Sequence, residues 1–209
     1  PLSIAKTSLY LIDKKHGIDP TRNEYLGRIA EQIDTLYLLF DRMTQMIRVD
    51  YGEFELLPID LMAIVNEVVV TGKVKITGAL DRVALQTDSH RPVMIDGVEE
   101  LMKVALEELL RNAVQFSHDD TPVVFALDVM ADEVVLSVKD DGMGIAEEHL
   151  QDIFTRFYRI DEARTKRGIG LGLQIVQKIV AIHGGRIEVE SAVGRGSVFR
   201  FVLPLREEV

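Results

Sequence analysis

Apolar residues recur at alternating spacings of three and four between residues 26 and 47. This repeat places one continuous apolar stripe along a helix, as in helical bundles and coiled coils. A shorter stripe of the same kind runs through residues 2–12, and the Gly and Pro within residues 16–21 separate the two. Because Gly and Pro end one helix and allow another to start, we predict a helical hairpin at the start of the chain.

The predicted hairpin leaves apolar surface uncovered. Two antiparallel helices by themselves bury only part of each stripe, so such a hairpin pairs most naturally with a second copy to form a four-helix bundle. We therefore expect a homodimer through residues 1–50. Packing of the hairpin against the rest of its own chain is the alternative.

The pattern changes after residue 52. A short run at 54–56 and Pro58 follow, and Asp60 is a suitable N-cap for an apolar run at 61–70. Alternating apolar positions and turn residues then predict these elements in order: a weak strand at 83–85, a strand at 93–95, a helix at 98–116, a hairpin of 123–130 with 134–139 turning at 131–133, a helix at 171–183, and a hairpin of 186–191 with 197–203.

The predicted fold class is α+β. Strands that are grouped in hairpins and interspersed with helices indicate an α/β sandwich with a mixed sheet, preceded by the helical hairpin. We place the helical hairpin at residues 1–52, a linker at 53–59 and the second domain at 60–209.

Composition and charge narrow the classes of function. Acidic side chains outnumber basic ones by 34 to 24, and the formal charge of −10 argues against nucleic-acid binding because it repels a phosphate backbone. The chain has no Cys, which suits the reducing cytoplasm. Its most apolar stretch, 61–70, is shorter than the ~20 residues of a membrane span, so we expect no membrane contact by this segment. Since Pro1 replaces an initiator Met, we expect upstream sequence to be missing, and any membrane anchor of the parent protein would lie there.

The first segment with candidate chemistry lies in the predicted helix at 98–116. Glu108 and Asn112 are four residues apart and therefore lie on the same side of that helix, one turn from each other. A carboxylate beside an amide oxygen can hold Mg²⁺ directly or through water. The alternative is an ordinary polar pair on a solvated helix face.

The second segment is Asp140-Asp141-Gly142-Met143-Gly144, directly after an alternating strand. A carboxylate at a strand end can accept a hydrogen bond from an exocyclic amine, and the two glycines let the backbone turn sharply and lie close to a flat ligand. The alternative is an ordinary turn.

The third segment, residues 168–173, has glycines at every second position and opens the predicted helix at 171–183. Backbone N–H groups at a helix N-terminus are unpaired, and the helix dipole there favours an anion such as phosphate. The segment is not a dinucleotide-binding fingerprint, because that motif has Gly where Leu173 stands and follows a strand. The chain also lacks a P-loop.

Together these three segments resemble a known family. With residues 153–159 between the second and the third, their order resembles the N, G1, F and G2 boxes of the sensor histidine kinases of two-component systems. Residues 194–199 resemble the final Gly-rich box, and the hairpin resembles the dimerisation and phosphotransfer hairpin. The resemblance implies the ATP-binding sandwich shared with gyrase-type ATPases. It also implies transfer of the ATP γ-phosphoryl group to a histidine, for relay to the aspartate of a response-regulator receiver domain.

The resemblance also implies roles for individual residues. Asn112 would coordinate Mg²⁺, with Glu108 beside it as a general-base candidate or as a metal ligand through water. Asp140 would accept a hydrogen bond from the adenine amino group, helped by Ser197 through water. The other nucleotide-binding positions would be Gly142 and Gly144 at the base, Gly168, Gly170, Leu171, Gly172 and Leu173 around the phosphates, and Gln115 and Tyr158.

A basic segment completes the implied site. Arg159 resembles the residue that reaches the γ-phosphate, where positive charge assists phosphoryl transfer. Residues 155–167, which carry Arg156 and three further basic residues after Arg159, would form a mobile lid over ATP. A solvated basic loop is the alternative.

Two departures from the family pattern matter. Gln115 stands where the family often has Lys, which would lower phosphate affinity. The acceptor histidine belongs to an H-E-x-x-[ST]-P-[LF] box, whereas this sequence starts at Pro1-Leu2. We interpret the five histidines of the chain as surface or helix-end residues and not as the acceptor: His16, His90, His118, His149 and His183. We therefore expect ATP binding without self-phosphorylation. The alternatives are a gyrase-like or chaperone-like ATPase and a nucleotide-holding scaffold without turnover.

Overall fold

The computed structural model describes residues 7, 24–75, 82–87, 91–118, 121–160 and 169–206. The chain forms two compact units, Pro1–Arg48 and Val49–Val209. The predicted first helix, at 2–12, and the turn at 16–21 lie outside the described residues, apart from the helical residue 7. No helix in the described part of the chain is long and apolar enough to cross a membrane.

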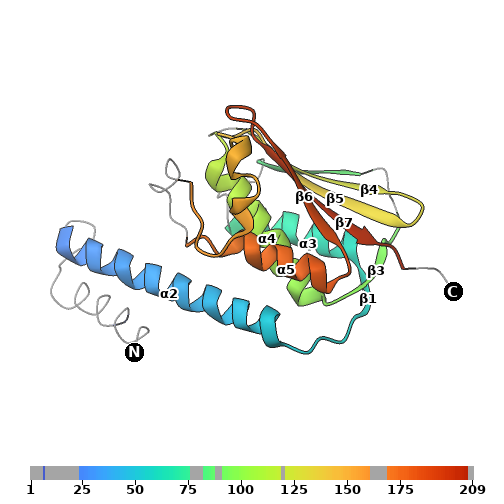
Figure 1. The fold of residues 1–209 in the computed structure, drawn as a ribbon, viewed down its shortest axis with the longest axis horizontal. Helices are drawn as coiled ribbons and strands as arrows, with labels where there is room; N and C mark the ends of the chain where they lie inside the picture. The colour runs from blue at the N-terminus through green and yellow to red at the C-terminus, as the bar shows by residue number, and fades with distance from the viewer. Residues whose placement is uncertain are drawn as a thin grey trace. The chain divides into compact units, whose positions relative to one another are not determined.

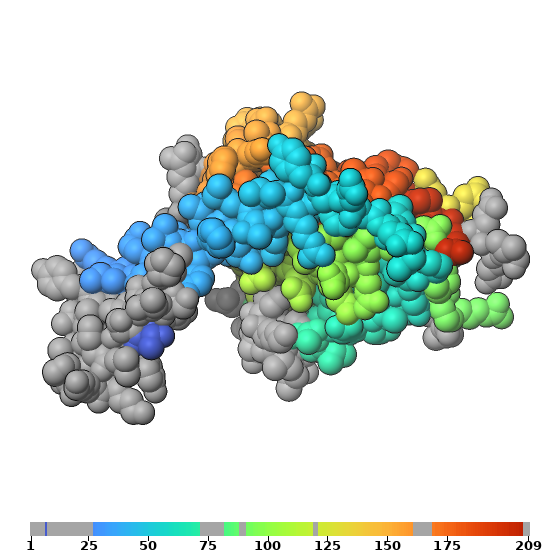
Figure 2. Space-filling view, turned by 90° about the horizontal axis from the view of Figure 1, so that it is seen from below, coloured from blue at the N-terminus to red at the C-terminus, as the bar shows by residue number. Residues whose placement is uncertain are grey.

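The first unit contains most of one long helix, α2 (Glu24–Tyr51), drawn in blue in Figures 1 and 2. This helix confirms the prediction for residues 26–47. Phe40 is 68% exposed, and the neighbouring positions of the apolar stripe are also exposed, with the exception of Ile33. The exposed members are Ile29, Leu36, Phe40, Met43 and Ile47.

The second unit is built on a five-stranded sheet of strand order β2-β4-β5-β7-β6. Its strands are β2 (Val83–Thr87), β4 (Val123–Val129), β5 (Glu133–Asp140), β6 (Arg186–Ser191) and β7 (Ser197–Pro204). The pair β2 and β4 is parallel, and the other pairs are antiparallel. The sheet is therefore mixed and the fold class is α+β, as predicted.

Three helices cover one face of the sheet, as Figure 1 shows: α3 (Leu61–Lys75), α4 (Glu99–Phe116) and α5 (Gly172–Ile182). Alternate strand residues such as Phe125, Leu136 and Phe201 point into the core beneath these helices and are fully buried. Because one face packs and the other faces solvent, the strands alternate between buried and more exposed residues. Two short 3₁₀ turns, Glu147–His149 and Asp152–Phe154, lie between β5 and α5.

The second unit contains a short strand inside the segment proposed as a linker. Residues 57–59 form with Asp60 the strand β1 (Leu57–Asp60), which pairs antiparallel with β3 (Met94–Gly97). Asp60 begins α3 as predicted, since its Oδ1 accepts hydrogen bonds from the N–H of Met62 at 3.0 Å and of Val93 at 3.1 Å. The same carboxylate therefore caps α3 and binds the backbone of Val93, the residue before β3.

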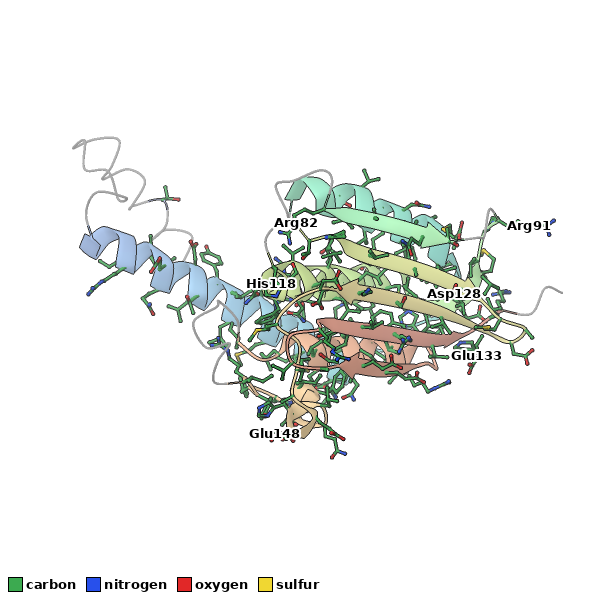
Figure 3. All side chains as sticks on the ribbon, turned by 90° about the horizontal axis from the view of Figure 1, so that it is seen from above. Arg82, Arg91, His118, Asp128, Glu133 and Glu148 are labelled. Carbon is green, nitrogen blue, oxygen red and sulfur yellow. The ribbon has the colours of Figure 1, made fainter. Side chains whose placement is uncertain are left out.

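Asp140 and Ser197, two of the predicted site residues, lie together at one end of the sheet. In the strand register Asp140 pairs with Ser197, and the adjacent Lys139 pairs with Val124 at the start of β4. The end of β5 therefore lies beside the beginnings of β4 and β7. Figure 3 shows Arg82 and His118 at this end of the sheet, and Arg91, Asp128 and Glu133 at the other.

Candidate functional site

Glu108 lies where α4 meets the beginning of α5. Its side chain is buried, with only 4% of the residue exposed, and its Oε1 lies 3.6 Å from Nε of Arg111. A Cβ atom added to Gly172 would lie 2.7 Å from Glu108 Oε2, so glycine leaves the carboxylate its place. The structure thus joins the first and third predicted segments. It is inconsistent with the alternative that Glu108 stands on a solvated helix face.

The N-terminus of α5 has the features expected of an anion site. Its N-cap residue, Leu171, is buried and supplies no side-chain cap to the first N–H groups of the helix. Glycines at 170 and 172 flank that residue, while Leu173 continues the helix. Gly168 lies outside the described residues, so its predicted role stays a prediction.

Asp140 ends β5 with its carboxyl group almost entirely buried. Its Oδ1 accepts a hydrogen bond from the N–H of Gly142 at 2.9 Å, and the N–H of Ser197 donates to the same carboxyl group. Burial nevertheless raises the pKa of Asp140 to about 6, because removing the charge from water outweighs those two bonds. This carboxylate is accordingly a strong acceptor with few protein donors.

The turn after Asp140 needs its glycines because backbone atoms lie against them. A Cβ at Gly142 would collide with the carbonyl oxygen of Phe116, at the end of α4, and one at Gly144 with that of Ala192. Gly144 also has a φ of +68°, which favours glycine. The second predicted segment is therefore packed between α4 and the β6–β7 turn.

Ser191 was not predicted and joins the second segment to the final Gly-rich box. Its hydroxyl contacts the N–H of Ile145, the carbonyl oxygen of Gly196 and the hydroxyl of Ser197, at distances from 2.7 to 2.9 Å. In addition, the N–H of Gly194 donates to the carbonyl of Met143 at 2.8 Å. A serine at the end of a predicted edge strand carries no motif signal, so only the fold identifies it.

Arg82 was also missed by the sequence analysis. Its guanidinium donates to the hydroxyl of Ser117 at 2.7 Å and to the carbonyl oxygens of His118 and Thr121. These bonds fasten the end of α4 to the start of β2. Ser117 in turn forms an isolated bridge with Gly142, so Arg82 supports the turn that follows Asp140.

The segment between the second and third motifs packs against the third. The N–H of Phe157 donates to the carbonyl of Gly170 at 2.8 Å, and Phe157 has a φ of +62°, which is rare for an aromatic residue. Tyr158 shares a hydrogen bond of 2.7 Å with His149. Both Tyr158 and Arg159 are half-buried.

Part of the predicted lid is fixed to its surroundings. Arg156 donates to Oε1 of Gln174 in α5 at 3.1 Å and to Oδ2 of Asp50 at 2.8 Å. Lys178 also forms an ion pair with Asp50, and its hydrogen bond lowers the pKa of that carboxyl group. The remaining lid positions from 161 to 167 lie outside the described residues.

His183 ends α5, in line with the expectation of a helix-end histidine. Only 2% of it is exposed. His118 is exposed and His149 is half-buried, whereas His16 and His90 lie outside the described residues.

Glu108 and Asn112 can supply some, but not all, of the oxygen ligands that Mg²⁺ requires. A buried carboxylate and a half-buried amide one helical turn away are oxygen ligands of the kind that Mg²⁺ takes. Within the described part of the chain, no three Asp, Glu or His side chains gather to hold a metal by themselves. An ion at this place would therefore need oxygen atoms from a phosphate ligand and from water.

Comparison with known proteins defines the class. Residues 97–207, more than half of the chain, match the family described as histidine kinase-, DNA gyrase B-, and HSP90-like ATPase. The chain therefore belongs to this family of ATPase domains, as its motifs indicated.

Curated relatives are sensor proteins. The chain is 34% identical over 142 residues to the sensor histidine kinase WalK of Bacillus subtilis (strain 168), a match covering 62% of this chain and 23% of WalK. It is 43% identical over 108 residues to the sensor protein SrrB of Staphylococcus aureus (strain NCTC 8325 / PS 47), covering 51% and 18%. The chain thus spans about a quarter or less of the curated relatives it matches. Full-length ShkA in complex with AMPPNP has the same fold, with a TM-score of 0.74 at 24% identity, over 92% of this chain and 40% of that one.

Proposed function

We propose that this chain is the catalytic core of a sensor histidine kinase. It binds ATP with Mg²⁺ in the second unit and transfers the γ-phosphoryl group to a histidine, from which a response-regulator aspartate receives it. Two observations carry the proposal: Asp140 pairs with Ser197 at the end of the sheet, and the buried Glu108 lies against Gly172 at the uncapped N-terminus of α5. The sensor-kinase relatives and the AMPPNP ligand of ShkA support it.

The adenine base is recognised by Asp140. Its carboxylate accepts a hydrogen bond from the exocyclic amine, and Ser197, its partner in the strand register, accepts through water. Gly142 and Gly144 shape the base site, because their lack of a Cβ lets the turn after Asp140 pack against the backbone of Phe116 and Ala192. This arrangement prefers an amino group at the recognised edge of the purine.

The phosphates are held at the N-terminus of α5. Its free N–H groups and the positive end of its dipole face the anion, and Gly170 and Gly172 let the backbone approach closely. Asn112 would hold the Mg²⁺, with Glu108 contributing through water, and Gln115, Tyr158 and Arg159 would line the polyphosphate. When bound, Mg²⁺ neutralises charge on the phosphate oxygens.

In the transfer step a nitrogen of the acceptor imidazole attacks the γ-phosphorus while the bond to the bridging oxygen breaks and ADP leaves. Glu108 takes the proton of the other imidazole nitrogen as general base, and Arg159 stabilises the charge that spreads over the γ-phosphoryl oxygens. The 209 residues contain no H-E-x-x-[ST]-P box.

Nucleotide binding is tested by thermal unfolding. ATP with Mg²⁺ should raise the Tm of the chain, because a ligand bound only by the folded state stabilises it by mass action. Asp140→Asn should abolish this shift, since its amide presents a donor to the adenine amine. A shift of wild-type size in that variant would contradict the role of Asp140.

The same variant should raise the Tm of the nucleotide-free chain at pH 7. The folded pKa of Asp140 is about 6, above its ordinary value of 3.8. Between these two pH values the folded chain therefore binds the proton more tightly than the unfolded chain does. Above pH 6 the buried negative charge lowers the free energy of unfolding by roughly 1–3 kcal/mol. A gain in apo stability together with loss of the ATP shift separates lost recognition from misfolding.

Histidine phosphorylation is tested with γ-labelled ATP. The chain as printed should stay unlabelled, whereas the same chain preceded by an H-E-x-x-T segment should gain an acid-labile, alkali-stable label. Glu108→Gln should lower the labelling rate at least tenfold while ATP still raises the Tm. ATP hydrolysis without label on the extended chain would favour an ATPase, and binding without turnover would favour a scaffold. Label on the printed chain that persists in His16→Gln would overturn the assignment of the acceptor.

A further inference from the structure

Three polar residues form one row across the end of the sheet. Asp140 on β5 pairs with Ser197 on β7, which pairs with Ser191 on β6. Directly paired residues of antiparallel strands project from the same face of a sheet. In this row the face is the one covered by the helices, and both Asp140 and Ser197 are more than nine-tenths buried.

The direction of the hydrogen bonds in this row follows from counting protons. The Ser191 hydroxyl has a single proton and contacts three groups. The carbonyl oxygen of Gly196, at 2.7 Å, can only accept, so it takes that proton. The N–H of Ile145, at 2.8 Å, can only donate. At the 2.9 Å contact with Ser197, the oxygen of Ser191 must therefore accept.

Ser197 must therefore donate its hydroxyl proton in its contact with Ser191. Its only hydroxyl proton points to Ser191, so the oxygen offers lone pairs alone to anything else that approaches it. Beside it, the ionised carboxylate of Asp140 also only accepts. The end of the row therefore accepts hydrogen bonds at two adjacent positions and donates none from these side chains.

We propose that Ser191 is a positioning residue that fixes the Ser197 hydroxyl as an acceptor and thereby strengthens selection of a 6-amino purine over a 6-oxo purine. The proposal rests on the proposed function, in which adenine binds at Asp140 and Ser197. The amine of adenine supplies the donors that this edge requires, directly or through one water. The 6-oxo group of hypoxanthine supplies a further acceptor and leaves the buried acceptors unpaired.

The experiment compares the Kd values of ATP and inosine triphosphate, which differ at the 6-position of the purine and in the proton that inosine carries on N1. In Ser191→Ala the Ser197 proton is released and can turn toward the 6-oxo group. The ratio of the two Kd values should then fall about fivefold, the factor expected for one hydrogen bond. Ser191→Thr keeps a hydroxyl at the same place and should keep the wild-type ratio.

A double variant separates orientation from general loosening. In a Ser197→Ala background there is no hydroxyl to orient, so adding Ser191→Ala should leave the ratio unchanged. Equal weakening of both nucleotides in Ser191→Ala would assign Ser191 a structural role only and overturn the proposal. If Ser191→Ala does not fold, Ser197→Ala alone should still lower the ratio, and an unchanged ratio there would overturn it as well. Failure of the wild-type chain to bind ATP would instead overturn the proposed function and this inference with it.

Discussion

At the scale of single residues, the fit between Gly172 and Glu108 determines where the carboxylate of the proposed general base lies. The Oε2 atom of Glu108 occupies the place that a side chain at position 172 would need. The first residue of α5 therefore sets the position of a carboxylate that α4 supplies. Glycine at this position leaves room for the neighbouring carboxylate, in addition to its proposed role at the phosphates.

Gly172→Ala should separate catalysis from folding. Position 172 is helical and has no positive φ, so alanine is compatible with the backbone and stability should change by about 1 kcal/mol or less. The added methyl group displaces the Glu108 carboxylate, and histidine labelling of the acceptor-bearing chain should fall at least tenfold. In a Glu108→Ala background the same substitution should have no further effect, and a further loss there would assign the damage to the phosphate-binding backbone.

At the scale of elements, His183 connects the end of α5 with the start of α4. Its Nδ1 donates to the carbonyl of Ile179 at 2.7 Å, and its Nε2 accepts from the N–H of Val98 at 3.0 Å. A Cβ at Gly97 would collide with the imidazole ring. This pattern requires the neutral tautomer with its proton on Nδ1, and burial lowers the pKa of His183 below its ordinary value of 6.5.

The free energy of unfolding should therefore fall as the pH is lowered below about 6.5, because the unfolded chain takes up a proton that the folded chain refuses. Asp140 contributes the opposite slope, so chemical denaturation is best measured in Asp140→Asn. Adding His183→Gln should remove the slope that remains, whereas His118→Gln, at an exposed position, should keep it. A slope that survives His183→Gln would place the titrating group elsewhere.

Local patterns predicted the elements that bury an amphipathic face, such as α4, and the hairpins with clear turns, β4 with β5 and β6 with β7. They did not predict the parallel pairing of β2 with β4, because pairing partners distant in sequence leave no local signal. The same holds for Arg82, whose acceptors lie 35 or more residues away.

The residues of the candidate site also differ in whether the sequence indicated them. Glu108, Asp140 and the glycines were found because their residue types and spacing are unusual for a plain core. Ser191 was not, since its role depends on the register that places it beside Ser197. Sequence thus pointed to the groups proposed to contact the ligand and not to the groups that contact them through the fold.

At the scale of the whole molecule, the exposed stripe on α2 is the surface that a second copy would cover. Phe40→Glu should convert the proposed homodimer into monomers that still bind ATP, because a buried charge opposes the interface and the proposed nucleotide site lies in the other unit. Thr35→Glu is the matched control, an exposed position of α2 away from the stripe. Sedimentation of the parent chain as a monomer would contradict the dimer, as would equal dissociation by both variants.

The strand order has a consequence for synthesis on the ribosome. Strand β7 comes last in the sequence but lies inside the sheet, between β5 and β6. Until residues 197–204 have left the exit tunnel, β5 can pair only with β4, so its other edge is open. At that stage β6 has no neighbour in this sheet. Such edges are prone to pair with other chains. The nascent chain therefore exposes these edges at a stage when Asp140 has already been made and Ser197, its partner in the register, is still missing.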